Sequence, residues 1–286
     1  MAHTFTLGHS PDPDDAFMFY AMAEGKISLA GHSFEHILMD IQTLNEWAVE
    51  GKLDITAISI HAFAYVSDKY ALLPSGASMG DGYGPMFVAR EGDWGNTDAS
   101  RAEWLRGKII AIPGEMTSAY LAAQLFLGAD FRRIVVPFDE IFNAVADGRA
   151  DAGLLIHEGQ LTFAAEGLSL ILDLGEWWKR TRGLPLPLGG NVIRRDIPEN
   201  LQTEISDILR ESIRYGLENR SPAINHSMAH ARGLDTALAD KFIGMYVNDF
   251  TMDYGDTGRR AITQFLDEAY EAGLIPTRPG VAFVRG

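Results

Sequence analysis

Two stretches of the chain, Ala48-Val-Glu-Gly-Lys-Leu-Asp54 and Ala144-Val-Ala-Asp-Gly-Arg-Ala-Asp151, have the same construction. Each combines the end of a helix, a glycine C-cap, a basic residue and an aspartate just before an apolar strand. The strands that follow end in His61 and His157. This repeat predicts two α/β units of similar build. A helix, a glycine and a strand in this order are, however, also common in α/β proteins in general.

Strand-like and helix-like segments alternate along the chain, which favours an α/β fold with largely parallel sheets. Periodicity breaks at 92–98 and again after the proline-punctuated run 184–188. We therefore expect two lobes around a central cleft, with two crossings of the chain along 85–90 and 191–195. The first lobe comprises 1–90 and 191–286, including a mainly helical segment from residue 199 onward, and the second lobe comprises 91–190.

Composition excludes several classes of function. The 286 residues are 47% hydrophobic, enough for a sizeable core, and carry a formal charge of −15. That charge disfavours nucleic acid and anionic membranes as partners, so an anionic substrate must be held by local donors. Cysteine is absent, which excludes disulfides, thiolate metal sites and thiol nucleophiles. Oligomeric state cannot be deduced from these numbers.

The N-terminal residues read directly as a strand, without the basic and apolar regions of a signal peptide, and no window is long and apolar enough to span a bilayer. We expect a cytoplasmic protein.

Ligands of open α/β sheets bind beyond the carboxyl ends of the strands, where helices also begin. The loops to inspect are therefore 8–15, 59–61, 112–118 and 156–160. Thr117 and Ser118 stand at a predicted helix start, where hydroxyls and amides suit a carboxylate. Either residue could instead serve only as an N-cap.

His157 is the strongest candidate for chemistry. It follows the wholly apolar run Ala152-Gly-Leu-Leu-Ile156, and Glu158 comes directly after it. An imidazole at a strand end faces the cleft and titrates near neutral pH, which suits a general base. A structural histidine is the alternative, and His61 at the matching position of the other unit is the main rival.

Other motifs argue against metals and cofactors. Ser10-Pro-Asp-Pro-Asp-Asp15 is acidic but lacks a regular ligand spacing, so it reads as a turn and the first turn of a helix. The glycine-rich stretch 75–84 lacks the Lys-Ser/Thr of a P-loop, and neither G-x-S-x-G nor H-E-x-x-H occurs. We expect no metal and no cofactor.

Four segments together resemble a known enzyme family. They are Leu7-Gly-His-Ser-Pro-Asp-Pro-Asp-Asp-Ala-Phe-Met-Phe-Tyr20, Leu154-Leu-Ile-His-Glu-Gly-Gln-Leu-Thr-Phe163, Gly183-Leu-Pro-Leu-Pro-Leu-Gly189 and Tyr246-Val-Asn-Asp-Phe250. In this order they are similar to the 1,4-dihydroxy-6-naphthoate synthases of the futalosine route to menaquinone. The two lobes and the cleft then correspond to a periplasmic-binding-protein-like (type II) fold.

The resemblance implies a cofactor-independent lyase that converts cyclic dehypoxanthinyl futalosine, a small carboxylated substrate, to 1,4-dihydroxy-6-naphthoate and dihydroxyacetone. It implies that His157 is the base. It also implies that Ala57, Ile58, Ser59, Thr117 and Ser118 contact the substrate. We add Ser10 and Asp14 from the first turn and Asn191 from the second crossing.

Two departures from the family pattern indicate a divergent branch. The family usually reads Ser-Pro-Cys-Pro-Asn-Asp-Thr-Phe where this chain has Ser10-Pro-Asp-Pro-Asp-Asp-Ala-Phe17, and it commonly has lysine at the position of Ala57. Asp14 in place of an amide and the missing cation both make the cleft less favourable for an anion. The alternatives are a non-catalytic solute-binding protein of the same fold and the related chorismate dehydratase.

Overall fold

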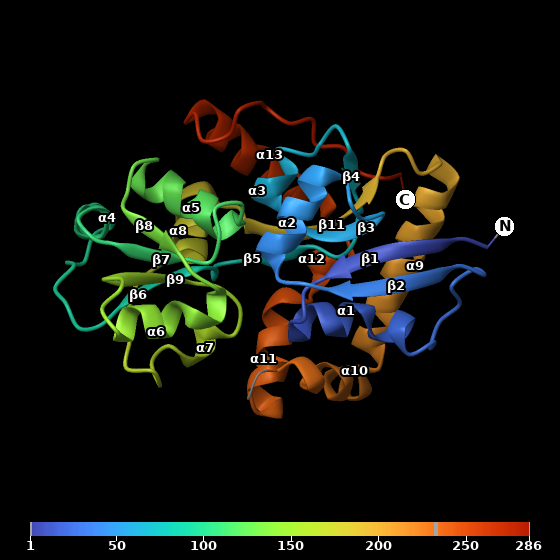
Figure 1. Ribbon diagram of the computed structural model, residues 1–286, viewed down its shortest axis with the longest axis horizontal. Helices are drawn as coiled ribbons and strands as arrows, with labels where there is room; N and C mark the ends of the chain where they lie inside the picture. The colour runs from blue at the N-terminus through green and yellow to red at the C-terminus, as the bar shows by residue number, and fades with distance from the viewer. Residues whose placement is uncertain (1, 232–233, 286) are drawn as a thin grey trace.

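The computed structural model describes residues 2–231 and 234–285 and shows two α/β lobes side by side (Figure 1). The first lobe holds a six-stranded sheet in the order β2-β1-β3-β11-β4, with β5 paired to β11. Its strands are β1 (Thr4–His9), β2 (Ser33–Leu38), β3 (Ile55–Ser59), β4 (Tyr70–Leu72), β5 (Ser78–Gly80) and β11 (Leu186–Arg194).

The second lobe holds a five-stranded sheet in the order β10-β6-β9-β7-β8. Its strands are β6 (Met86–Ala89), β7 (Ile110–Ile112), β8 (Arg133–Val135), β9 (Ala152–Leu155) and β10 (Ser169–Asp173). The two-lobed fold predicted from the sequence is confirmed.

Helices cover both sheets (Figure 1). In the first part of the chain they are α1 (Pro13–Ala23), α2 (Ile41–Glu50) and α3 (Ile60–Phe63). The second lobe contributes α4 (Asp98–Arg106), α5 (Ser118–Leu127), the 3₁₀ helix η1 (Phe138–Glu140), α6 (Ile141–Ala146), α7 (Gly159–Thr162) and α8 (Leu174–Arg182). The C-terminal part adds α9 (Glu199–Glu218), α10 (Arg220–Ser227), the 3₁₀ helix η2 (Met228–His230), α11 (Thr236–Tyr246), α12 (Asp249–Met252) and α13 (Gly255–Glu271).

The sheets are mixed, which corrects the prediction of largely parallel sheets. β1 runs parallel to β2 and β3, and β7 runs parallel to β8 and β9. The two strands on which the chain crosses between lobes are antiparallel to their neighbours: β11 against β3, β4 and β5, and β6 against β9 and β10. A strand that arrives from the other lobe enters its sheet against the direction of the local βα units.

The predicted crossings at 85–90 and 191–195 coincide with β6 and with the end of β11, respectively. β6, which the predicted boundary after residue 90 leaves in the first lobe, belongs to the second sheet. β11 starts at Leu186, ahead of the predicted return at residue 191. The proline-punctuated run 184–188 therefore overlaps a strand, and it pairs with the short β5 through an irregular register.

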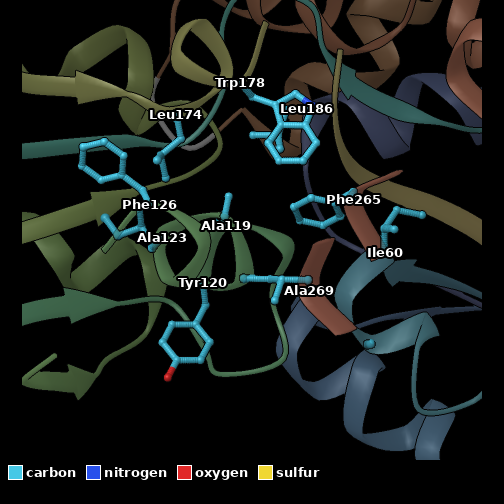
Figure 2. Packing of buried hydrophobic residues seen from close by; sticks show 14 of the residues in the cluster. Ile60, Ala119, Tyr120, Ala123, Phe126, Leu174, Trp178, Leu186, Phe265 and Ala269 are labelled. Carbon is cyan, nitrogen blue, oxygen red and sulfur yellow. The ribbon is translucent and has the colours of Figure 1, made fainter. Parts of the chain in front are cut away.

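One apolar cluster runs across both lobes. Trp178 of α8 packs edge-on against Phe265 of α13, with ring centroids 5.4 Å apart, and both side chains are fully buried (Figure 2). Ala119 and Phe126 of α5 belong to the same cluster. Each large apolar side chain buried in this way contributes about 1.5–3 kcal/mol. This cluster packs the two lobes against each other.

None of the helices in the ranges 2–231 and 234–285 is long and apolar enough to cross a membrane.

Candidate active site

A cavity of about 740 Å³, including its open mouth, lies between the lobes. Its wall combines the carboxyl ends of β3 and β9, the first turns of α1 and α5, and parts of β11 and α11. Strand ends and helix starts gather at this edge in open α/β sheets. Every site residue predicted from the sequence lines the cavity: Ser10, Asp14, Ala57, Ile58, Ser59, Thr117, Ser118, His157 and Asn191.

His157 follows β9 with a left-handed backbone, at a φ of 55°. This conformation is uncommon for residues other than glycine, histidine adopts it more readily than most, and such local strain is typical of functional sites. Its ring packs edge-on against Phe138, with centroids 4.8 Å apart, and its side chain remains 17% exposed. The imidazole is therefore both fixed and accessible from the cavity.

Asp12 is the carboxylate partner of this imidazole. Its Oδ2 lies 3.3 Å from Nδ1 of His157, and the Ser10 hydroxyl donates to the same oxygen at 2.7 Å. When Nδ1–H faces the carboxylate, Nε2 carries the lone pair of the neutral ring. Sequence reasoning missed Asp12 because the only signal was its place in the acidic turn, which reads as ordinary helix-start chemistry.

The other two carboxyl groups of this turn are also buried. Asp15 accepts a hydrogen bond from the Ser10 amide at 2.7 Å, yet burial raises the pKa of its carboxyl to about 6. Burial, followed by the nearby Asp15 and Asp12, raises the pKa of Asp14 well above its usual range. Oδ1 of Asp14 has no hydrogen-bond partner among the described residues.

The cavity wall offers no cationic side chain. Among the described residues that line it, none is lysine or arginine. Ala57, 6% exposed, adds only apolar surface to the wall. An anionic group in this cavity must be bound by backbone amides, hydroxyls, amides of side chains or uncharged acids.

Asn45 of α2 holds Ser59 in place at the end of β3. Its Oδ1 accepts from the Ser59 amide at 2.8 Å, and its Nδ2 donates to the Ser59 hydroxyl at 3.0 Å. Nδ2 also donates to the carbonyl of Met116 in the second lobe, at 3.3 Å. Because Ser59 Oγ accepts from Asn45, its own proton is available for the cavity. Asn45 had no signal in the sequence beyond being a polar residue within a helix.

At the start of α5, the side-chain hydroxyls of Thr117 and Ser118 are hydrogen-bonded within the protein. The Thr117 hydroxyl donates to the carbonyl of Gly114 at 2.8 Å and accepts from the amide of Tyr120 at 3.1 Å, so Thr117 is the N-cap. The Ser118 hydroxyl donates to the carbonyl of Leu188 at 2.5 Å and accepts from the amide of His61 at 3.1 Å. The amides of the first helical turn have no carbonyl partner within α5 and carry the positive end of its dipole.

His61 occupies a different environment from His157. It is 3% exposed and does not line the cavity. Its Nδ1 lies 3.2 Å from the carbonyl of Thr117, and its Nε2 has no partner among the described residues. Burial lowers the pKa of its ring to about 4. A ring that stays neutral and enclosed at this position is suited to packing between the lobes.

Gln160 and Tyr246 close the cavity from opposite lobes. The Tyr246 hydroxyl of α11 donates to Oε1 of Gln160 in α7 at 2.7 Å, and these two helices lie side by side (Figure 1). Both side chains are buried, and burial raises the pKa of Tyr246 well above its usual range. Both residues stand in motifs that carry the family resemblance, yet only tertiary structure shows that they meet.

Asn191 presents an acceptor at the wall formed by β11. Its Nδ2 donates to the carbonyl of Gly76 at 3.2 Å, while Oδ1 has no partner within the described ranges. Gly76 has a φ of 86°, and a Cβ there would lie 2.2 Å from Nδ2 of Asn191. Glycine is therefore required at residue 76 to hold this amide, whose oxygen can accept from a substrate hydroxyl.

In the described parts of the chain, no group of three or more histidine, aspartate or glutamate side chains has the arrangement of a metal site. The acidic turn is organised by Ser10 and the start of α1, as the contacts above describe.

Solved structures support the fold. A protein from Archaeoglobus fulgidus is 45% identical, with a TM-score of 0.89 over 95% of this chain and 98% of that one. The alkanesulfonate-binding protein of Xanthomonas axonopodis pv. citri is only 14% identical but has a TM-score of 0.72 over 99% of this chain and 98% of its own. The second likeness concerns the fold alone, and it confirms the periplasmic-binding-protein-like architecture.

Sequence comparisons identify the family. Proteins of Thermus thermophilus and Streptomyces coelicolor, both named 1,4-dihydroxy-6-naphthoate synthase, are each 39% identical to this chain. They align over 97% and 96% of this chain and over 98% and 96% of their own lengths. A family model described as menaquinone biosynthesis matches residues 5–271. The chain belongs to this family of menaquinone-biosynthesis proteins.

Proposed function

We propose that this protein is a 1,4-dihydroxy-6-naphthoate synthase, a lyase that converts cyclic dehypoxanthinyl futalosine to 1,4-dihydroxy-6-naphthoate and dihydroxyacetone without a cofactor. The observation that carries the proposal is the His157–Asp12 pair at the wall of the inter-lobe cavity, in a chain that aligns end to end with two such synthases. The ligand is a small carboxylated molecule, with no role for nucleic acid. A biosynthetic step of this kind goes with a cytoplasmic location.

Proton removal is the task of His157. The imidazole accepts a proton from the substrate at Nε2, and the electron pair released opens the spiro-fused sugar ring. The bond to the three-carbon fragment then breaks. The fragment takes a proton back from the imidazolium and leaves as dihydroxyacetone, and the remaining rings become aromatic, which drives the reaction. The imidazolium that forms is stabilised by the Asp12 carboxylate 3.3 Å from Nδ1. A positioned base of this kind contributes about 10²–10⁴-fold in rate.

Other residues of the cavity wall bind the substrate. The amides in the first turn of α5 and the hydroxyl of Ser59 suit the substrate carboxylate, since both are donors near a helix start. Ala57 and Ile58 supply apolar surface for the rings. The side-chain oxygen of Asn191, which is unpartnered within the described ranges, and the Ser10 hydroxyl both lie at the cavity wall and are suited to hydrogen bonds with the sugar hydroxyls. This arrangement replaces the missing lysine with backbone donors.

Separate incubations of the purified protein with cyclic dehypoxanthinyl futalosine and with chorismate test the proposal. We expect only the first compound to be consumed, with 1,4-dihydroxy-6-naphthoate as the aromatic product. Consumption of chorismate would instead identify a chorismate dehydratase. Tight binding of either compound with quantitative recovery of it unchanged would identify a solute-binding protein.

A further inference from the structure

Asp14 is a buried polar group of the cavity wall with a side-chain oxygen, Oδ1, that has no hydrogen-bond partner among the described residues. Its side chain is only 9% exposed. Leaving a buried acceptor or donor unpaired costs about 1–3 kcal/mol, and more for a charged group. A group that carries such a cost at the wall of a cavity is suited to pairing with a ligand.

The surroundings of Asp14 oppose a negative charge. Asp12 and Asp15 flank it in the same turn and raise its pKa, whereas the backbone amides of Asp14 and Asp15 lower it less strongly. From other elements, Tyr246 of α11 interacts with it, and His157 after β9 lines the same cavity. His157 already pairs with Asp12, and the Asp15 carboxylate already accepts from the Ser10 amide. No lysine or arginine is found among the described residues that line the cavity. Burial and like charges together disfavour the ionised form, which is why the pKa of Asp14 is raised.

An uncharged carboxylic acid differs from a carboxylate because it can donate. It presents one O–H donor and one carbonyl acceptor, the same pair of functions that a side-chain amide presents. In ketosteroid isomerase, an aspartic acid kept neutral by its apolar site donates a hydrogen bond to a developing oxyanion. The turn that carries Asp14 also holds Asp12, the partner of His157, and Asp14 and His157 both line the cavity.

We propose that Asp14 is held as an uncharged carboxylic acid and donates a hydrogen bond to the oxygen on which negative charge develops when His157 removes the substrate proton. Asp14 is then a catalytic residue, and two aspartates of the acidic turn have different roles. Asp12 stays ionised beside the imidazole, whereas Asp14 keeps its proton beside the substrate. The part that concerns substrate and rate rests on the proposed function, while the protonation state does not.

The protonation state can be measured on the free protein. Difference infrared spectra recorded as a function of pH separate the carbonyl stretch of a protonated carboxyl from that of a carboxylate. We expect a protonated carboxyl that persists at neutral pH and disappears in Asp14→Asn. Asp15→Asn is the matched control, because it removes the neighbouring carboxyl. Burial is the first cause of the raised Asp14 pKa, so the Asp14 band should persist at neutral pH although it disappears at a lower pH than in the wild type. An Asp14 carboxyl that is ionised at neutral pH overturns the proposal.

Turnover of cyclic dehypoxanthinyl futalosine tests the donor role. Asp14→Ala removes the donor and should lower kcat by about 10²–10³-fold, as loss of an oxyanion donor does. Asp14→Asn keeps a weaker donor, so its kcat should fall about 10-fold or less. Wild-type activity should decline at alkaline pH as Asp14 ionises, and that decline should be absent in Asp14→Asn.

Two outcomes overturn the donor role: Asp14→Asn as inactive as Asp14→Ala, or an alkaline limb that persists in Asp14→Asn. If the wild-type protein does not turn over this compound, the proposed function fails, and the infrared titration still decides whether Asp14 is protonated.

Discussion

His61 and His157 hold matching places in the two lobes, yet only one of them faces the cavity. His61 lies one residue beyond the start of α3 in right-handed helical backbone, and His157 follows β9 in left-handed backbone. The helical backbone encloses His61 between the lobes, where it is 3% exposed. The left-handed turn leaves His157 at the cavity wall. The similar helix, glycine and strand patterns therefore place the two histidines at corresponding positions in the fold, and the local backbone conformation decides which of them faces the cavity.

The partners of the two rings extend the contrast. His61 faces the carbonyl of Thr117, which opposes but does not overcome the effect of burial, so the pKa of His61 is lowered to about 4. His157 faces the Asp12 carboxylate, which compensates a positive charge. A base must hold the proton that it takes, and only His157 has a counter-ion for it. Each experiment below tests one feature of this contrast.

Replacement of the imidazole should have the largest effect. His157→Ala should lower kcat by about 10³–10⁴-fold because the base is lost. Added imidazole should restore part of the turnover with saturation, since the deleted ring leaves space for it beside Asp12. The rate of 1,4-dihydroxy-6-naphthoate formation measures both effects. A His157→Ala protein with near-normal turnover would show that the base is elsewhere.

Removal of the counter-ion should have the next largest effect. Asp12→Asn should lower kcat about 10²-fold with a smaller change in KM, because an amide no longer stabilises the imidazolium. Ser10→Ala is the milder control, because it removes only the hydroxyl that holds Asp12. A near-normal kcat in a folded Asp12→Asn protein would contradict the role of the pair.

Replacement of Asp14 should change the pH dependence of stability. The folded protein keeps the Asp14 proton that the unfolded chain loses near pH 4, so folding binds a proton between these two pKa values. Stability contributed by this group therefore falls as pH rises through that window. Asp14→Asn has no such proton. Its free energy of unfolding, relative to that of the wild type, should therefore increase by at most about 1.4 kcal/mol per pH unit between pH 5 and 6.

Denaturant unfolding of wild type and Asp14→Asn at both pH values measures this difference. A difference that stays constant or shrinks as the pH rises would mean that Asp14 is ionised in the folded protein.

Loss of the α5 cap should have the smallest effect. Thr117→Ala removes the oxygen that accepts from the Tyr120 amide, and it should cost about 1 kcal/mol in the free energy of unfolding. Thermal unfolding and KM measured together distinguish a cap from a ligand contact. A large rise in KM with an unchanged melting temperature would mean that the hydroxyl binds substrate directly.

Much of the site could be predicted because the ends of the strands could be located in the sequence. Once Ser59 and His157 are assigned to the carboxyl ends of two strands, and Thr117 to a helix start, the α/β architecture brings them to one cavity. The directions of β6 and β11 were not predictable by the same argument. Their polarity depends on how the chain passes between lobes, which local periodicity does not encode.

The contacts that define the chemistry were beyond sequence reasoning. The Asp12–His157 and Gln160–Tyr246 pairs join segments far apart in the chain, and side-chain type alone does not specify them. The hydroxyl of Thr117 could be assigned as ligand or cap, and only its hydrogen bonds decide for the cap. The charge of Asp14 depends on burial, which no local motif expresses.

The most direct test of the account is one assay of wild type, His61→Ala and His157→Ala with cyclic dehypoxanthinyl futalosine, on preparations shown to be folded by circular dichroism. We predict that His157→Ala loses turnover by about 10³-fold or more, while His61→Ala melts at a lower temperature but keeps most of its turnover. A folded His61→Ala protein without activity, beside a His157→Ala protein that still forms 1,4-dihydroxy-6-naphthoate at the wild-type rate, would contradict the account.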